Sequence, residues 1–248
     1  MIVLKTDEEI KRMTEACRIV AEVLEGIKKL VSPVVTTKEL DKFAESYIIS
    51  KGARPAFKGY RGYPSTVCAS LNEQVVHGIP SADKLKNGDI ISIDVGVYYN
   101  GFYGDAAVTL PVGSISRQAQ KLLSVTENAL EAGIKKAVTG NRLSDISSTI
   151  QAHVESEGFT VVRTFVGHGI GRELHEDPQI PNYGRPGEGP KLLEGMTLAI
   201  EPMVNAGGWE VNILKDGWTA VTKDGSLSAH FEHTVAIAKN GQNILTKL

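Results

Sequence analysis

The spacing of hydrophobic positions predicts two helices near the N-terminal end. Thr6, with a glutamate three positions later, forms a capping box, and apolar residues then recur at steps of three and four as far as Ile27. Pro33 ends this pattern because proline removes a backbone donor. A second capping box begins at Thr36, and Gly52 is a natural end for the second helix.

The same periodicity returns in the middle of the chain. It predicts a third helix from about Ser116 to Val138, which stops near Gly140. Ser144 is the expected N-cap of a fourth helix, and Gly158 ends it. The chain therefore contains two pairs of helices.

Strands are expected on both sides of Asn100-Gly101, a strong signal for a two-residue hairpin turn. A tight turn there places Gly96 opposite Asp105. Asp94 is two residues from Gly96, so its side chain points to the same face as that of Asp105. The two carboxylates become diagonal neighbours, about 7–8 Å apart at the backbone. Like charges this close raise one another's pKa unless a cation lies between them.

The order helix, helix, loop histidine and strands occurs twice. In the second copy the histidine is His168, in a glycine-rich loop at 167–171, and the strands lie near 196–204 and 229–238. This predicts an α+β fold with two similar halves that face each other, and no linker separates them. We therefore expect one domain over residues 1–248.

Composition narrows the class of protein. The net charge of −2 gives no broad basic surface, and we find no nucleic-acid motif. Cys17 and Cys68 make no disulfide framework, which fits a reducing compartment. We find neither a signal peptide nor an apolar run of the roughly 20 residues that a membrane span needs. A cytoplasmic protein that does not enter the membrane is expected.

Five residues that bind metals in proteins interrupt apolar or glycine-rich runs: Asp94, Asp105, His168, Glu201 and Glu232. A single aspartate in an apolar strand is most often a structural residue with a partner. Five such positions favour a metal site, because an unpaired buried carboxylate costs roughly several kcal/mol. Four carboxylates and one imidazole suit two divalent ions, which activate water and polarise a carbonyl. The pattern therefore indicates hydrolytic chemistry.

Two further histidines have the environment of donors to a substrate. His77 precedes a glycine, and His175 lies in a polar segment after the loop that carries His168. His233 follows Glu232 and should point to the opposite face of the strand. His230 shares the face of Glu232 and is left without a role.

The chain resembles the type I methionine aminopeptidases of the short bacterial kind, in six segments: Val76-His77-Gly78-Ile79-Pro80, Ile93-Asp94-Val95-Gly96, Gly104-Asp105-Ala106, Gly167-His168-Gly169-Ile170-Gly171, Glu201-Pro202 and Phe231-Glu232-His233-Thr234. The resemblance spans essentially the whole chain. It implies the pita-bread fold, in which two pseudo-symmetric halves of antiparallel sheet are backed by helices. It also implies a metallo-exopeptidase that removes N-terminal methionine from peptides and nascent proteins.

The resemblance implies a role for each ligand. Asp94 would bind one metal ion, and Asp105 and Glu232 would bridge both ions. His168 and Glu201 would complete the second site, and Glu201 would also accept the proton of the attacking water. Such a site accepts Mn, Fe(II), Co or Zn, and availability decides among them.

The resemblance also implies how substrate is bound. His77 and His175 would contact the substrate amide and stabilise the tetrahedral intermediate, and their bulk should restrict the enzyme to a small second residue. Four positions would line the methionine pocket: Tyr60, Tyr63, Cys68 and Trp218. Asn72 and Ser228 match positions around a monovalent-cation site.

Two residues depart from some bacterial members of the family. Phe57 stands where these have cysteine and Leu174 where they have phenylalanine, so the shape of the pocket is in question but the reaction is not. The spacing from Glu201 to Glu232 leaves no room for the helical insertion of type II enzymes. No zinc-binding extension precedes the first helix.

Three other classes compete with this interpretation. They are a pita-bread peptidase that cleaves beside proline, a non-catalytic peptide-binding module, and a redox or nucleotide enzyme, for which no motif is present. The complete ligand set argues against the binding module, and the aromatic pocket argues against the proline-specific enzyme. We expect a monomer; contact with the ribosome is a further expectation, with no residue assigned to it.

Overall fold

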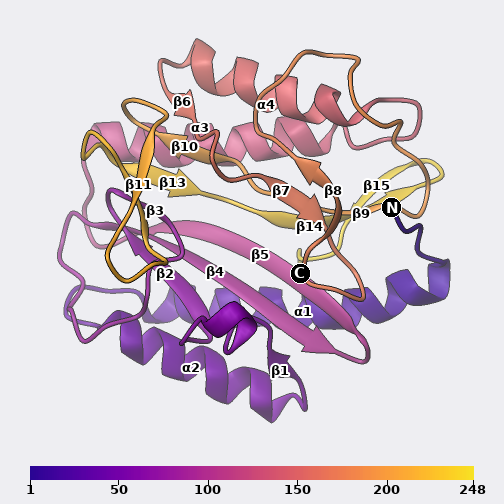
Figure 1. Cartoon of the computed structure of the whole chain (residues 1–248). Coiled ribbons are helices and arrows are strands. Elements are labelled where there is room, and N and C mark those ends of the chain that lie inside the picture. The colour runs from indigo at the N-terminus through magenta and orange to yellow at the C-terminus, as the bar shows by residue number, and fades with distance from the viewer.

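The computed structural model describes residues 1–248 and contains four long helices on two outer faces (Figure 1). They are α1 (Asp7–Leu30), α2 (Thr37–Ser50), α3 (Arg117–Ile134) and α4 (Leu143–Ser156). Both predicted capping boxes are formed, at Thr6 and at Thr36. Ser116 caps α3 as expected, although that helix ends at Ile134, before the predicted Val138. None of the helices combines the length and apolar character that crossing a bilayer requires.

The predicted start of the fourth helix is wrong. α4 begins at Leu143, and its N-cap is Arg142, whose backbone N–H donates to the Asp145 carboxylate at 2.7 Å. Ser144 therefore lies in the first turn. Its hydroxyl donates to the backbone carbonyl of Glu188 at 2.6 Å, so this side chain fixes a neighbouring loop rather than the end of the helix.

Antiparallel strands form two main sheets, one in each half of the chain. The first joins β1 (Arg54–Pro55), β4 (Ile90–Tyr99) and β2 (Val67–Leu71), with β5 (Phe102–Pro111) paired to β4. The second has the order β15 (Gly241–Ile244), β14 (His233–Ala238), β9 (Thr197–Ile200), β7 (Gly167–Gly169) and β8 (Glu176–Ile180). The expected strand regions near 196–204 and 229–238 each contain one strand of this sheet, β9 and β14, and one strand of a smaller sheet described next.

Two small sheets complete the fold. One contains β13 (Ser228–His230), β10 (Met203–Asn205) and β6 (Thr160–Val161). The other contains β11 (Val211–Ile213), β12 (Ala220–Thr222) and β3 (Gln74–Val76), and a single 3₁₀ turn covers Tyr60–Gly62.

The glycine-rich segment that carries His168 is a strand, β7, and not the predicted loop. It lies between β8 and β9, where the backbones approach closely. A Cβ at Gly167 would lie 2.5 Å from the carbonyl oxygen of Ala199, and one at Gly169 would lie 2.1 Å from that of Asp177. The glycines therefore permit close strand packing, and the turn-like composition is misleading.

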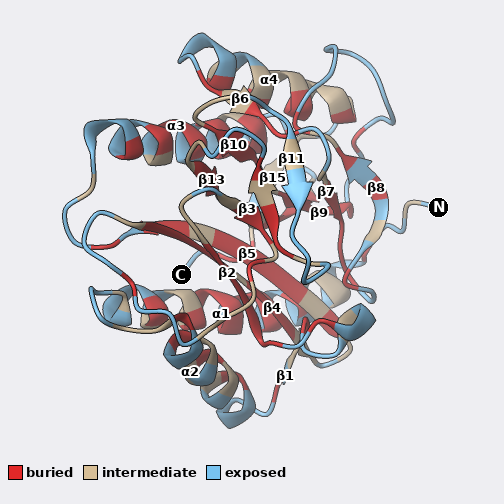
Figure 2. Cartoon of the chain, turned by 60° about the vertical axis from the view of Figure 1, so that its left-hand side comes forward, coloured by how far each residue is buried: buried red, intermediate tan, exposed pale blue.

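Each half has its own hydrophobic core between its helices and its main sheet. A cluster of 18 buried residues joins α1 and α2 to β4 and β5, and a cluster of 24 joins α3 and α4 to the second sheet. Figure 2 shows buried residues along the strands and exposed residues on the outer helix faces. The two predicted halves are confirmed by this arrangement.

The halves meet where β5 runs beside β13 and β14, and we call this junction the seam. Hydrogen bonds at alternate positions of β5 join them, among them Thr234 Oγ1 to Asp105 O at 2.7 Å, Glu232 N to Ala107 O at 2.9 Å, and Thr109 Oγ1 to His230 O at 2.8 Å. The seam therefore brings Asp105 and Glu232 close together from opposite halves.

Candidate active site

The β4–β5 hairpin has the predicted register. Gly96 pairs with Asp105, and Asp94 pairs with Ala107. Asp94 and Asp105 therefore come from neighbouring strands and point to one face, as the turn at Asn100-Gly101 indicated. Asp105 is buried, with 4% of its surface exposed.

The second half supplies the remaining three predicted ligands. His168 lies on β7, Glu201 directly follows β9, and Glu232 directly precedes β14. One ligand atom from each of Asp105, His168 and Glu232 lies within 4.8 Å of the others. Nε2 of His168 is 3.6 Å from Oε1 of Glu201, so this carboxylate belongs to the same group.

The tautomer of His168 follows from its neighbour. Nδ1 lies 2.8 Å from the carbonyl oxygen of Gly169, which only accepts hydrogen bonds. Nδ1 must therefore carry the hydrogen, and the lone pair of Nε2 is free. Burial lowers the pKa of His168 to about 3, which keeps the ring neutral, the form that binds metals.

The carboxylates have few partners inside the protein. Asp94 Oδ1, Asp105 Oδ1 and Glu232 Oε1 are buried without a hydrogen bond. Burial raises the pKa of Asp94 to about 7 and holds those of Asp105, Glu201 and Glu232 well above the usual range. Oxygen atoms without partners, together with one imidazole nitrogen, fit a site for divalent metal ions.

The ligands line a cavity of about 180 Å³, which we call the carboxylate cavity. Its other walls include every predicted substrate-binding residue and both departures from the family pattern: Tyr60, Tyr63, Cys68, His77, His175, Trp218, Phe57 and Leu174. One end of the cavity is therefore acidic, and the other is apolar and aromatic.

Hydrogen bonds and ring contacts fix the aromatic walls. The hydroxyl of Tyr60 lies 2.9 Å from Nδ1 of His175. The ring of Trp218 meets that of Tyr63 edge-on at 5.1 Å, and the ring of His77 lies 6.5 Å from Trp218. The pocket is thus built from rings that hold one another in place.

Tyr63 and Cys68 contribute surface and not reactive groups. The hydroxyl of Tyr63 donates to the carbonyls of Val67 and Gly78, at 3.1 and 2.9 Å, so the protein itself satisfies it. Burial raises the pKa of the Cys68 thiol well above its usual value. A thiol in this environment is a poor nucleophile.

The predicted monovalent-cation residues lie together. The backbone N–H of Ser228 donates to the carbonyl of Asn72 at 2.8 Å. The amide oxygen of Asn72, however, already accepts from the N–H of Ile90 at 3.0 Å. Neither residue lines the carboxylate cavity.

Two residues at the site had no role assigned from the sequence. His230 is buried, and its Nε2 lies 3.6 Å from Oε2 of Glu201; the alternation of the strand had placed it on the face of Glu232. Arg61 lines the cavity from the 3₁₀ turn, at a φ of 49°. No pattern in the sequence marks Arg61, because its position depends on that turn.

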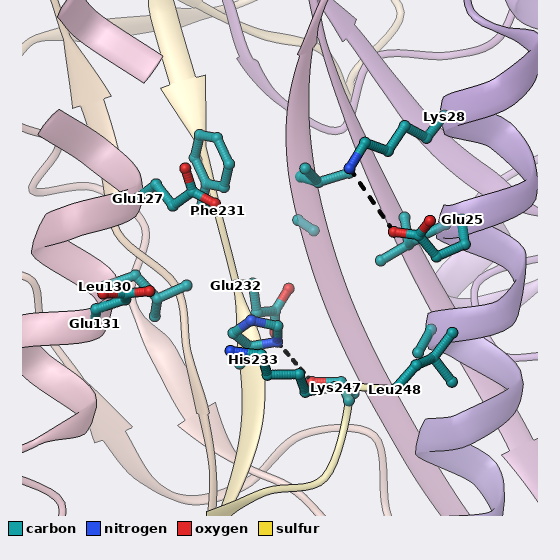
Figure 3. Close-up of a pocket in the computed structure, with 15 residues that line it drawn as sticks. Glu25, Lys28, Glu127, Leu130, Glu131, Phe231, Glu232, His233, Lys247 and Leu248 are labelled. Atoms are coloured by element: carbon teal, nitrogen blue, oxygen red, sulfur yellow. Dashed lines mark hydrogen bonds and ion pairs between the residues drawn. The ribbon is translucent and has the colours of Figure 1, made fainter. Parts of the chain in front are cut away.

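A second cavity, of about 510 Å³, lies between α1 and α3 and is called here the interhelix cavity (Figure 3). Glu232 lines both cavities, and His233 lies beside it with Nδ1 2.8 Å from the Thr246 hydroxyl. No other predicted ligand reaches this space. The carboxylate cavity is therefore the candidate active site.

Comparison with known proteins agrees with this geometry. The sequence profile of metallopeptidase family M24 matches residues 11–239. The chain belongs to this family. A methionine aminopeptidase of Clostridium perfringens is 57% identical to it over 99% of both chains. The expected enzyme class, a metallo-exopeptidase, is confirmed.

Solved structures support the same conclusion. The methionine aminopeptidase of Thermotoga maritima superposes with a TM-score of 0.98, at 52% identity and with complete coverage of both chains. The predicted pita-bread fold and the resemblance to methionine aminopeptidases are thus confirmed. A prolidase from Pyrococcus furiosus has a TM-score of 0.82 at 24% identity, and this likeness shows the shared fold alone.

Proposed function

We propose that this chain is a dinuclear-metal enzyme that hydrolyses the bond after an N-terminal methionine in peptides and nascent proteins whose second residue is small. The observation that carries the proposal is the carboxylate cavity, in which five metal-binding side chains border an apolar pocket. Its volume of about 180 Å³ is suited to one side chain and the start of a peptide. Full-length relatives at 57% and 52% identity bear the name of this activity.

The proposed metal ligands are Asp94, Asp105, His168, Glu201 and Glu232, which would together hold two divalent ions. Bound there, divalent ions would lower the pKa of a water molecule and polarise the substrate carbonyl. The seam supports this ligand set, because it brings Asp105 and Glu232 together from opposite halves. Mn, Fe(II), Co and Zn all suit the donor set.

The protein's own side chains would accept the proton of the attacking water and stabilise the charge that develops on the substrate. We assign Glu201 as the proton acceptor and His77 and His175 as donors to the substrate amide. Nδ1 of His175 is engaged by the hydroxyl of Tyr60, so Nε2 is the atom available to substrate. Burial lowers the pKa of both histidines, that of His77 to about 4, which favours neutral rings near neutral pH.

The apolar end of the cavity is the proposed pocket for the methionine side chain. Aromatic rings and a thioether sulfur attract one another by about 0.3–1.5 kcal/mol per contact. The proposed contacts are Tyr60, Tyr63, Cys68, His77, His175 and Trp218, all of which line the cavity. Phe57 and Leu174 would shape the same pocket with apolar surface.

Other features of the function are proposed on the same basis. The whole chain, residues 1–248, would act as a single catalytic domain, as a monomer in the cytoplasm and with access to nascent chains at the ribosome. Asn72 and Ser228 would contribute to a monovalent-cation site, supported by the backbone hydrogen bond that joins them.

Hydrolysis of matched tripeptides tests the proposal. Met-Ala-Ser should be cleaved and Met-Leu-Ser should not, because His77 and His175 restrict the space beyond the scissile bond. We expect kcat/KM to differ by at least about tenfold. A chelator should abolish cleavage of Met-Ala-Ser, and added Mn²⁺ or Co²⁺ should restore it.

Leu-Ala-Ser is the control for the first position, and it should not be cleaved. Equal rates for Met-Ala-Ser and Met-Leu-Ser would contradict the small-residue requirement. Undiminished activity in protein shown to be metal-free by elemental analysis would contradict the dinuclear mechanism.

A further inference from the structure

The segment before α1 buries a lysine beside the active-site loop. Lys5 is only 6% exposed, and its backbone N–H donates to the carbonyl of Gly195 at 2.7 Å. Its ammonium group forms an ion pair with Glu176 and donates to the carbonyl of Val3 at 3.2 Å. Lysine is rarely buried unless it is paired, so this contact calls for an explanation.

Glu176 in turn organises the loop that carries His175. One carboxylate oxygen, Oε2, receives the Lys5 ammonium. The other, Oε1, accepts the backbone N–H groups of Arg172 and Glu173 at 2.7 and 3.2 Å. The chain from Arg172 to Glu176 is thus folded around this one side chain.

A second ion pair ties the same loop to α1. A guanidinium nitrogen of Arg172 lies 2.8 Å from the carboxylate of Glu9. This pair is more exposed than the first, since 63% of the Arg172 side chain is accessible, against 3% for Lys5 and 10% for Glu176. Solvent therefore screens the attraction within the inner pair less than that within the outer pair.

The backbone leaves space for the lysine stem. A Cβ at Gly171 would lie 2.3 Å from Cε of Lys5 and 2.8 Å from Oε1 of Glu176. A Cβ at Gly195 would lie 2.7 Å from the carbonyl oxygen of Lys5. Gly171 thus leaves space for the side chain of Lys5, and Gly195 leaves space for its backbone.

The loop reaches the candidate active site through the residues just before Glu176. Leu174 and His175 both line the carboxylate cavity. The ring of His175 lies 4.3 Å from that of His168 and is held by the hydroxyl of Tyr60. A displacement of the loop therefore displaces His175.

We propose that Lys5 is a positioning residue: its buried ion pair with Glu176 fixes the loop that presents His175 to the substrate. The inference rests on the proposed function of His175 as a donor to the substrate amide. A shift of about 1 Å in such a donor costs up to roughly 100-fold in rate. Lys5 itself does not line the cavity and would act only through the loop.

Lys5→Met is the first test, because it keeps the aliphatic stem and removes the charge. We expect kcat on Met-Ala-Ser to fall by about 10–100-fold, KM to stay within about threefold, and metal content to be unchanged. Lys11→Met is the matched control; this lysine is exposed on α1 and forms no ion pair, so its turnover should equal that of the wild type. Lys5→Arg, which restores a cation, should recover part of kcat.

Removal of the Lys5 charge leaves the Glu176 charge buried, so Lys5→Met is also compared with the neutral double variant Lys5→Met/Glu176→Gln. The second variant should unfold at a higher temperature than the first and still turn over slowly. Wild-type kcat in the neutral pair would overturn the proposal.

A double-mutant cycle with His175→Ala distinguishes positioning from general support of the fold. If Lys5 acts through His175, adding Lys5→Met to the His175→Ala variant should lower kcat by less than about threefold. An equal fractional loss in both backgrounds would overturn the inference and leave the proposed function intact. Wild-type turnover of His175→Ala alone would instead overturn the proposed role of His175 and, with it, the inference.

Discussion

At the scale of single residues, the site is defined by polar atoms that lack partners. Asp94, Asp105 and Glu232 each bury an oxygen atom without a hydrogen bond. The neighbouring His168 instead has one nitrogen satisfied by a carbonyl and the other free. Its free nitrogen, Nε2, lies 3.6 Å from the carboxylate of Glu201, which groups His168 with the proposed ligands.

His168→Ala and His175→Ala should have different effects. The first removes the nitrogen that faces the carboxylates, so we expect lower metal occupancy by elemental analysis. The second should leave the metal bound and lower kcat by about 10²–10³-fold, the usual loss for one donor to a developing oxyanion. If His175→Ala lost its metal and His168→Ala kept it, the roles of metal ligand and substrate donor would have to be exchanged between the two histidines.

At the scale of elements, α1 packs on β5 with almost no space between the backbones. A Cβ added at Gly104 would lie 2.8 Å from both the backbone nitrogen and Sγ of Cys17. Gly104 directly precedes Asp105, so this contact determines how closely the helix approaches a proposed ligand.

Gly104→Ala should therefore destabilise the protein by about 1–3 kcal/mol, as overpacking usually does, and weaken metal binding by displacing Asp105. Thermal unfolding and metal titration would measure the two effects. Gly26→Ala, on α1, is the control, because the added Cβ meets only the ring tip of Phe43, 2.4 Å away. The Phe43 ring can move, and alanine has a higher helix propensity than glycine by about 1 kcal/mol, so the stability and metal affinity of this variant should stay near those of the wild type. Equal losses in both variants would contradict the argument.

Local signals predicted the elements that local contacts determine. The capping boxes at Thr6 and Thr36 mark the true ends of two helices, since both partners lie within four residues. The Asn100-Gly101 turn fixed the register of the hairpin, and so the pairing of Gly96 with Asp105. The identity of the fold as pita-bread and the role of each candidate ligand required, in addition, the likeness of whole segments to a known family.

Predictions failed where distant segments decide the structure. Ser144 has the composition of an N-cap, but its hydroxyl bonds to Glu188, far along the chain. Gly167 and Gly169 suggested a loop, but they are glycine because the carbonyls of Ala199 and Asp177 approach them. Such contacts leave no signal in the periodicity of one segment.

At the scale of the whole molecule, the buried carboxyl groups make stability depend on metal and on pH together. The pKa of Asp94 is raised from 3.8 to about 7, and those of Asp105, Glu201 and Glu232 are raised as well. In metal-free protein these groups stabilise the fold below their unfolded pKa, and that stability is lost as pH rises through the folded pKa. Metal ions compensate the charge that then appears.

Chelation should therefore lower the unfolding temperature more at about pH 7.5 than at about pH 5.5. Burial also lowers the pKa of His77, His168 and His233, but these rings stay neutral with or without metal over that range and largely cancel in the comparison. Differential scanning fluorimetry with and without a chelator measures the effect. A larger loss at the lower pH would show that the carboxyl groups do not set the stability of the site.

The seam has a thermodynamic consequence for the two halves. The proposed ligands Asp105 and Glu232 approach each other only while β5 lies against β13 and β14, so metal affinity and the association of the halves would share one free energy. Coupling of this kind is reciprocal. A change that weakens the seam would lower metal affinity by the same factor by which bound metal strengthens the association of the halves. The metal ions would then join the two halves of the chain, and we expect that their removal would first increase the motion of each half relative to the other.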